Sequence, residues 1–354
     1  MNKKNLNILI ILLCASLVIA TYFFVKSKQR VEIDSGYRLV MGTFAHIIAV
    51  AHDSGTANKS IEAAFGQLHS IEELMSYHRD DSELAGINRN AFKEPVKISS
   101  QTFEVLQQAI EFSKLSDGAF DVTVGPLMDL WRKAGEANTV PSDDKLAEAR
   151  AKVGYEKVIL DVNETTVRFA VEGMKLDLGG IAKGYAIDKA IEAMQNCGAT
   201  AGLVDVGGNI RCFGKPKGKP YWRIGLQDPN ENLGFQISDF GFPAEAGKPL
   251  LILKLNDAAV ATSGHYRRFA LIEGKRHSHI IDTTTGSSSD KLASVTIIAK
   301  DATTADALST AVIVLGAEKG IALIEKLPET EAILITSEPK YEIIKTAGAE
   351  KYIK

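Results

Sequence analysis

The chain lacks an excess of positive charge. Its 354 residues include 41 Lys and Arg against 44 Asp and Glu, which gives a formal net charge of −3 at pH 7. No run of Lys and Arg alternates with aromatic residues, so the sequence offers no basic surface for the phosphate backbone of a nucleic acid. We therefore expect no nucleic acid partner.

Cysteine is also scarce. Only Cys14, Cys197 and Cys212 are present, and the flanks of the last two show no metal-type pairing. Cys197 and Cys212 can form a disulfide outside the cytoplasm or be small core residues, and we favour the core. Cys14 has Leu13 where a lipoprotein signal has a small residue, so we favour an unmodified Cys14. The histidines show no ligand spacing that would indicate a zinc site.

Repeats and low-complexity segments are absent, and only one long hydrophobic run occurs. This run extends from Ile8 to Val25 behind Lys3 and Lys4, which fits a signal peptide or a marginally short membrane span. We expect residues 1–30 to be a signal peptide or membrane anchor with a basic linker, and residues 31–354 to form the functional domain. The domain would then lie on the extracytoplasmic, periplasmic side, attached to the inner membrane.

Strand and helix signals intermingle along the remaining chain. Alternating apolar residues and turn signals predict strands at 43–50, 157–160, 167–169, 174–178, 203–206, 210–213, 222–226, 250–255, 258–262, 268–272, 279–281 and 295–298. Apolar residues at helical spacing predict helices at 60–75, 99–115, 142–153, 181–196 and 302–315. Short hairpins join many of the strands, so we expect an α+β fold with mostly antiparallel sheets and packed helices.

The helix expected at 302–315 carries an acidic and a hydroxyl side chain one turn apart. Asp306 and Thr310 face the same way, and Thr303 or Thr304 can cap the start of the helix. A carboxylate and a hydroxyl suit a hard cation such as Mg²⁺, which takes few protein ligands and completes its shell with water and phosphate oxygens. On spacing alone, a solvated polar face is the favoured interpretation.

The glycine pair Gly179-Gly180 precedes the helix expected at 181–196. Free backbone N–H groups and the helix dipole at such a junction favour anions such as a diphosphate. On the residues alone, a tight turn that needs glycine for backbone reasons is the favoured interpretation of the pair. The G-x-G-x-x-G spacing of a Rossmann dinucleotide site is missing, so flavin binding here would use another scaffold.

Several short motifs, taken in order, resemble those of the ApbE family of FAD:protein FMN transferases. Each motif is weak alone, but the ordered set runs from about Met41 to Leu315. The motifs are M-G-T at 41–43, S-E-L at 82–84, A-F-D-V-T-V-G-P at 119–126, D-L-G-G-I-A-K-G-Y at 177–185, V-G-G-N at 206–209, S-H-I-I-D at 278–282 and A-T-T-A-D-A-L-S-T-A at 302–311. The resemblance implies a T-fold-like architecture.

The resemblance also implies a set of binding residues. The metal would take the backbone oxygen of Ala182 and the side-chain oxygens of Asp306 and Thr310. The residues expected against FAD are Met41, His78, Ala119, Phe120, Asp121, Lys183 and Ile281. Many relatives have tyrosine where this chain has His78 beside Tyr77. Either ring can stack on the isoalloxazine, and an imidazole there can make FAD affinity depend on pH.

His279 is the candidate proton acceptor. It precedes Asp282 by three residues in the family's S-H-x-x-D pattern, with Thr283 in place of the usual proline. An imidazole can accept the proton of an attacking hydroxyl. A structural histidine bound by Asp282 or by backbone is an equally good interpretation. His277, expected on the same side of a strand, is the weaker candidate.

The activity implied by the resemblance is a Mg²⁺-dependent transfer of FMN from FAD to a threonine side chain of an acceptor protein, with release of AMP. His279 and Asp306 would be the catalytic residues, and the acceptor would be a subunit of a membrane redox complex. The alternatives are an FAD pyrophosphatase that gives FMN and AMP, and a non-catalytic flavin-binding membrane-attached protein. We expect Asp306 to be an exposed cavity ligand that can be removed without loss of the fold.

Overall fold

The computed structural model describes residues 30–229, 249–264, 269–337 and 341–354. The hydrophobic run Ile8 to Val25 and Cys14 lie outside these ranges. Within them, no helix combines the length and the apolar character needed to cross a membrane.

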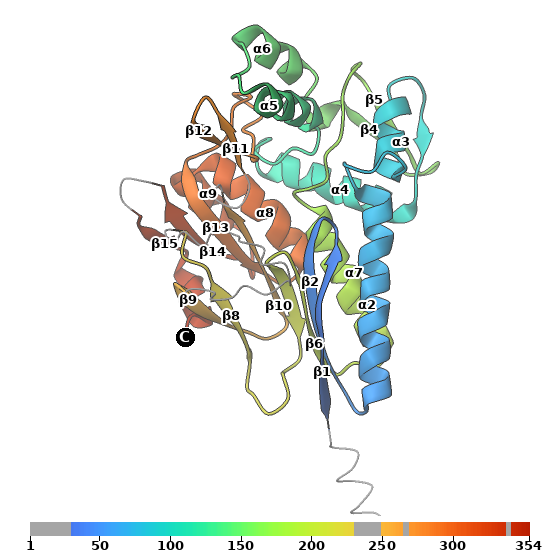
Figure 1. Cartoon of the computed structure of the whole chain (residues 1–354), viewed down its shortest axis with the longest axis vertical. Coiled ribbons are helices and arrows are strands. Elements are labelled where there is room, and N and C mark those ends of the chain that lie inside the picture. Colours follow the sequence, from blue (N-terminus) through green and yellow to red (C-terminus); the bar gives the residue numbers. More distant parts are fainter. Residues whose placement is uncertain (1–29, 230–248, 265–268, 338–340) are drawn as a thin grey trace, which may run out of the picture.

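An eight-stranded antiparallel sheet runs through the molecule in the order β1-β2-β6-β7-β10-β13-β14-β15 (Figure 1). Its strands are β1 (Val31–Val40), β2 (Thr43–Ala51), β6 (Ala201–Val206), β7 (Asn209–Phe213), β10 (Ala258–Gly264), β13 (Leu292–Ala299), β14 (Glu331–Thr336) and β15 (Ile343–Lys345). Strand β13 is buried along its whole length. It is therefore covered on both faces, which explains its nearly continuous apolar sequence.

Different elements cover the two faces of this sheet. Helices α2 (Ser54–Met75), α7 (Ala182–Asn196), α8 (Ala302–Leu315) and α9 (Ala317–Ile324) share the larger apolar core with one face. The hairpin of β8 (Trp222–Leu226) and β9 (Leu251–Leu255) and the C-terminal 3₁₀ helix η2 (Ala347–Tyr352) pack on the other. Cys212 lies in this second core, as expected, and burial raises the pKa of its thiol to about 12. Cys197 is half-buried, and neither cysteine forms a disulfide.

A smaller group of elements forms the upper part of Figure 1. It contains α3 (Glu83–Asn90), α4 (Ser100–Leu115), α5 (Gly125–Ala137), α6 (Asp143–Ala151), the 3₁₀ turn η1 (Tyr155–Lys157), the sheet of β3 (Val96–Lys97), β5 (Thr166–Phe169) and β4 (Val158–Asp161), and the hairpin of β11 (Phe269–Ile272) and β12 (Lys275–Ser278). A third apolar cluster, which includes Leu127, Trp131, Ile272 and Ile281, joins α5 and α6 to this hairpin.

The mixed α and β composition and the mostly antiparallel pairing are confirmed, but two predicted strands are wrong. Residues 174–178 form only a single bridge, between Lys175 and Val124. The backbone there is satisfied differently, because Leu176 N–H donates to the side chain of Asn88 and Asp177 N–H donates to Val122 O. Residues 279–281 are not a strand either. Strand β12 ends at Ser278, so His277 and His279 do not share a strand face.

The start of α8 also differs from the prediction. Asp301 is the N-cap residue, and its carboxylate accepts a 2.8 Å hydrogen bond from Thr304 N–H. Thr303 instead donates from its hydroxyl to Asp188 on α7, at 2.6 Å. A carboxylate two positions before Thr303 therefore takes the capping role, and the Thr303 hydroxyl ties two helices together.

Candidate active site

The first turns of α7 and α8 cross in close contact. A Cβ on Gly184 would lie 2.2 Å from Ala302 O, so only glycine lets the helices approach this far. The carboxylate of Asp188, one turn further along α7, accepts from the backbone N–H groups of Ala302 and Thr303, each at 2.9 Å. Two N–H groups at the start of α8 are thus satisfied by a neighbouring helix, which fixes the register of the pair.

Asp306 is the most buried acidic residue of the predicted site, at 3% exposure. Its Oδ2 accepts from Gly184 N–H at 3.0 Å, and its Oδ1 accepts from the Asn209 side-chain amide at 2.7 Å. Lys183 Nζ lies 3.6 Å from the same Oδ1 and donates to Gly179 O at 3.0 Å. The expectation that Asp306 is an exposed ligand is therefore wrong, because elements from three parts of the chain converge on its carboxylate.

Thr310 lies on the same side of α8 as Asp306, as the spacing predicted. Its hydroxyl donates a long 3.4 Å hydrogen bond to Asp306 O. A Cβ on Gly180 would lie 3.3 Å from Thr310 Oγ1 and 3.1 Å from Phe120 Cε2. The glycine pair, the A-F-D segment and α8 therefore meet at one place, where Ala182 begins α7.

The expected flavin end involves the β1–β2 turn and the segment after α2. Met41 has a φ of 53° in that turn, and its side chain packs against the main core. Tyr77 is held by its hydroxyl, which donates to Asp129 Oδ1 at 2.9 Å, whereas His78 is exposed with its ring edge-on to Tyr77. Of the two rings, His78 is thus the more exposed, while Tyr77 is half-buried.

Asp177 is a member of this site to which sequence reasoning gave no separate role. Its carboxylate accepts from Gly179 N–H at 2.8 Å, in front of the glycine pair. Burial raises the pKa of Asp177, while the Gly179 hydrogen bond and the nearby His78 and Lys183 side chains oppose that shift. The only available signal was its position at the head of the D-L-G-G motif.

Asp121 has a different environment from the one expected of a ligand contact. Its carboxylate accepts from the Thr123 backbone and hydroxyl at 2.8 and 2.7 Å, and from Tyr155 N–H at 2.9 Å. Burial raises the pKa of Asp121. The residue lines an open cavity of about 480 Å³ together with Arg150 and Thr284, among others. Asp306, Thr310 and His279 do not line this cavity.

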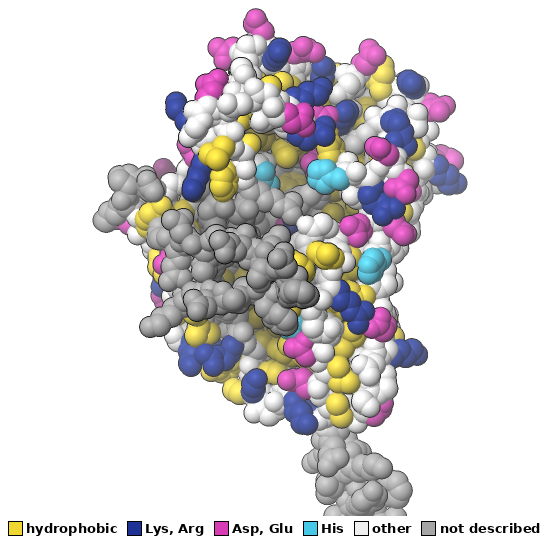
Figure 2. Space-filling view, viewed as in Figure 1, with side chains coloured by type: hydrophobic (Ala, Val, Ile, Leu, Met, Phe, Trp, Pro, Cys, Tyr) yellow, Lys and Arg dark blue, Asp and Glu magenta, His cyan; other side chains and the backbone are white. Residues whose placement is uncertain are grey.

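His279 is exposed on the segment that follows β12. Ile281, two residues on, is 6% exposed and packs in the third apolar cluster, so its side chain is a core residue. This segment reaches the A-F-D region through Thr283, whose hydroxyl donates to Gly118 O at 2.9 Å. In Figure 2, histidine side chains lie where the upper helices meet the sheet, beside a hollow with hydrophobic side chains in it.

The oxygen donors around Asp306 are of the kind that hard cations prefer, and no sulfur or imidazole donor contacts this carboxylate in the described bonds. No group of three or more His, Cys, Asp or Glu side chains that could hold a metal occurs within the described ranges. Asp306 contributes one carboxylate and Thr310 one hydroxyl, and each carboxylate oxygen keeps a lone pair beyond its single hydrogen bond. A cation, the Lys183 ammonium, already lies beside this carboxylate.

Comparison with known proteins identifies the relatives of the chain. The model of the ApbE family matches residues 41–334. The FAD:protein FMN transferase of Treponema pallidum is 33% identical over 323 residues, which cover 87% of this chain and 86% of the relative. The FAD:protein FMN transferase of Vibrio cholerae is 34% identical over 289 residues, which cover 80% of this chain and 82% of the relative. The crystal structure of the ApbE protein from Thermotoga maritima has a TM-score of 0.79 at 31% identity and covers 92% of this chain and 100% of its own. The flavin transferase ApbE from Vibrio cholerae has a TM-score of 0.74 at 30% identity and covers 92% and 99%.

Proposed function

Because this chain belongs to the ApbE family and is a FAD:protein FMN transferase, we propose that it joins FMN through a phosphoester to a threonine of its acceptor protein. In this proposal, Asp306 and Thr310 bind the Mg²⁺ ion that the transfer requires. The single observation that carries the site is the convergence of Gly184, Asn209 and Lys183 on the Asp306 carboxylate.

The donor set supports Mg²⁺ as the cofactor. The Asp306 carboxylate and the Thr310 hydroxyl are hard oxygen ligands on one helix face, and the Ala182 backbone oxygen is the third ligand implied by the family motif. Mg²⁺ prefers such oxygens and is usually bound by few protein groups. When bound, the ion neutralises charge that develops on the diphosphate.

The remaining groups act on the nucleotide and on the attacking hydroxyl. The dipole at the start of α7 favours the diphosphate, and the Lys183 ammonium adds positive charge there, whereas Gly179 N–H is already bonded to the Asp177 carboxylate. The acceptor threonine oxygen forms a bond to the FMN phosphorus while the bond from that phosphorus to the bridging oxygen breaks. AMP leaves with the bridging oxygen, and His279 accepts the hydroxyl proton.

FAD would lie with its flavin ring against His78 and Met41. The exposed His78 ring supports this placement, since the Tyr77 ring is half-buried and its hydroxyl is bonded to Asp129. Phe120, next to Gly180 and Thr310, would be packed beside the diphosphate. The contacts to Ala119 and Ile281 would be made through backbone, because both side chains are buried.

One incubation tests the acceptor residue and the metal together. The enzyme is mixed with FAD and a protein carrying the target segment, with and without Mg²⁺, and with threonine replaced by valine. We expect the mass of FMN to appear on the acceptor only when both threonine and Mg²⁺ are present. FMN on another residue would overturn the threonine assignment, and equal transfer after removal of divalent cations would overturn the metal assignment. AMP release without acceptor would reveal FAD hydrolysis instead.

The proposed location is the extracytoplasmic side of the inner membrane, with residues 1–30 as the signal or anchor. The hydrophobic run behind Lys3 and Lys4 supports it. The acceptor would then be a subunit of a membrane redox complex. Cell fractionation of the full chain and of a chain without residues 1–29 tests this location. Equal distribution of the two proteins would contradict it.

A further inference from the structure

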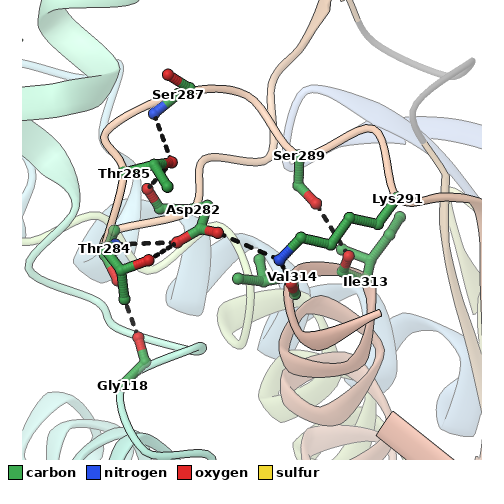
Figure 3. Close-up of polar contacts among 10 residues, drawn as sticks. Gly118, Asp282, Thr284, Thr285, Ser287, Ser289, Lys291, Ile313 and Val314 are labelled. Carbon is green, nitrogen blue, oxygen red and sulfur yellow. Dashed lines mark hydrogen bonds and ion pairs between the residues drawn. The ribbon is translucent and has the colours of Figure 1, made fainter. Parts of the chain in front are cut away.

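The segment after His279 is a closed loop with its own internal bonds. Asp282 N–H donates to Ser287 O at 2.9 Å, and Ser289 N–H donates to Ile280 O at 2.8 Å. The Asp282 carboxylate accepts from the backbone and the hydroxyl of Thr284, at 3.0 and 2.5 Å (Figure 3). These hydrogen bonds hold residues 280–289 together, and His279 directly precedes them in the chain.

This loop is docked on the last turn of α8 by two side chains (Figure 3). Lys291 Nζ donates to Val314 O at 2.6 Å and pairs with Asp282 Oδ2 at 3.4 Å. Ser289 donates from its hydroxyl to Ile313 O at 3.0 Å. The last carbonyl groups of a helix have no intrahelical partner, and positive charge is favoured there. Lys291 therefore joins the Asp282 carboxylate of the loop to a backbone carbonyl group at the C-terminal end of α8.

The same helix carries the proposed metal ligands. Val314 follows Thr310 by one turn, and Thr310 follows Asp306 by one turn. Lys291 thus links the helix that bears the ligand oxygens to the loop that bears the proposed proton acceptor, through the Asp282 carboxylate three residues after His279.

We propose that Lys291 is a positioning residue for FMN transfer, which sets the place of His279 relative to α8. This inference rests on the proposed role of His279. Reaction rates depend steeply on such placement, since a misplacement of about 1 Å can cost roughly 100-fold in rate. The Lys291 side chain is 49% exposed, so its contacts contribute little to global stability. If Lys291 only supported the fold, its replacement would therefore leave kcat almost unchanged.

A double-mutant cycle with His279 tests the proposal. The variants are Lys291→Met, Lys291→Arg, His279→Ala and the double variant Lys291→Met/His279→Ala. For Lys291→Met we expect kcat of transfer to fall by about tenfold while the Kd for FAD stays unchanged. Arginine can donate to both Asp282 and Val314 O, so Lys291→Arg should recover most of the rate. With His279→Ala already present, Lys291→Met should cause no further loss, because the two changes act through one group.

The control is Lys326→Met, which removes an exposed lysine just after α9 and should leave kcat, Kd and melting temperature unchanged. If Lys291→Met does not fold, Lys291→Gln enters the same cycle. An unchanged kcat, or an equal further loss in the His279→Ala background, would overturn the role of Lys291 alone. Full activity of His279→Ala would instead overturn the proton acceptor, and the inference with it.

Discussion

At the scale of single residues, the Asp306 carboxylate has two roles at once. It is a candidate metal ligand and the acceptor of two buried hydrogen bonds, from Gly184 N–H and the Asn209 amide. Buried donors that lose their acceptor are costly, so this residue contributes to folding as well as to the site.

For Asp306→Ala we therefore predict loss of Mg²⁺-dependent transfer together with a fall of about 1–3 kcal/mol in the free energy of unfolding. Asp306→Asn keeps one acceptor oxygen, so its loss of stability should be smaller although its activity is also lost. Transfer rates over a magnesium titration and urea unfolding measure the two effects. Parent-like activity of either variant at limiting magnesium would remove Asp306 from the metal site.

Tyr77 and His78 should differ in their effect on FAD. We expect His78→Ala to weaken FAD binding by about 1 kcal/mol, the usual worth of a ring contact beyond its buried area. Tyr77→Phe removes the bond to Asp129 and should leave FAD affinity unchanged. Quenching of flavin fluorescence on titration measures both. A loss of affinity in Tyr77→Phe but not in His78→Ala would show that the Tyr77 hydroxyl matters for FAD and the His78 ring does not.

Asp129 provides a test of pH dependence. Burial alone would raise its pKa, but hydrogen bonds from Lys175 and Tyr77 outweigh burial and hold the pKa below its usual range. A lowered pKa stabilises the fold above the unfolded-state value, about 3.9 for Asp, and this contribution disappears as pH falls through the folded-state value. Asp129→Asn should thus be about 1–3 kcal/mol less stable than the parent at pH 7, and the gap should close in acid. Urea unfolding at several pH values measures it, and a constant gap would refute the pairing.

At the scale of elements, the α7–α8 crossing fixes the site, and it depends on Gly184. We predict that Gly184→Ala lowers the free energy of unfolding by about 1–3 kcal/mol or more, because its Cβ would overlap Ala302 O. Gly86→Ala is the matched control, since nothing lies within 4 Å of a Cβ there and the helix α3 should gain about 1 kcal/mol. Thermal unfolding of both variants checks the contrast. Similar melting temperatures of the two variants would show that α7 and α8 can move apart to accommodate the added Cβ without loss of stability.

Local periodicity predicted many of the helices and strands, but it did not predict which segments form hydrogen bonds with one another. The strand 222–226 matches the structure to the residue, and the helix expected at 302–315 ends where α8 ends, because each has a clear apolar pattern and a sharp end. Strand β1 was missed because it is an edge strand, with mostly half-exposed or exposed side chains and a bulge between Asp34 and Tyr37. Residues 174–178 have a strand-like pattern, but their hydrogen bonds go to Asn88 and Val122.

At the scale of the whole molecule, the site joins segments that are far apart in sequence. Spacing alone placed Asp306 and Thr310 on one face, since both lie on one helix. The contacts of Asp306 with Gly184 and Asn209 span 122 and 97 residues, and local sequence carries no signal for them. The resemblance supplied the candidates Lys183 and Phe120, and the structure brings both to the same place.

Strand β1 also sets how far the reaction site stands from the point where the chain enters the fold. The strand runs from Val31 to Val40, the residue before Met41. At about 3.3 Å per residue, it is roughly 30 Å long. The entrance of the chain and the Met41 turn therefore lie at opposite ends of the β1–β2 ribbon (Figure 1). With the proposed anchor in a bilayer, an upright enzyme would reach only threonines displayed some 30 Å above the lipid surface. If residues 1–30 are the anchor as proposed, the target threonine of a flavin-carrying subunit would stand at about that height.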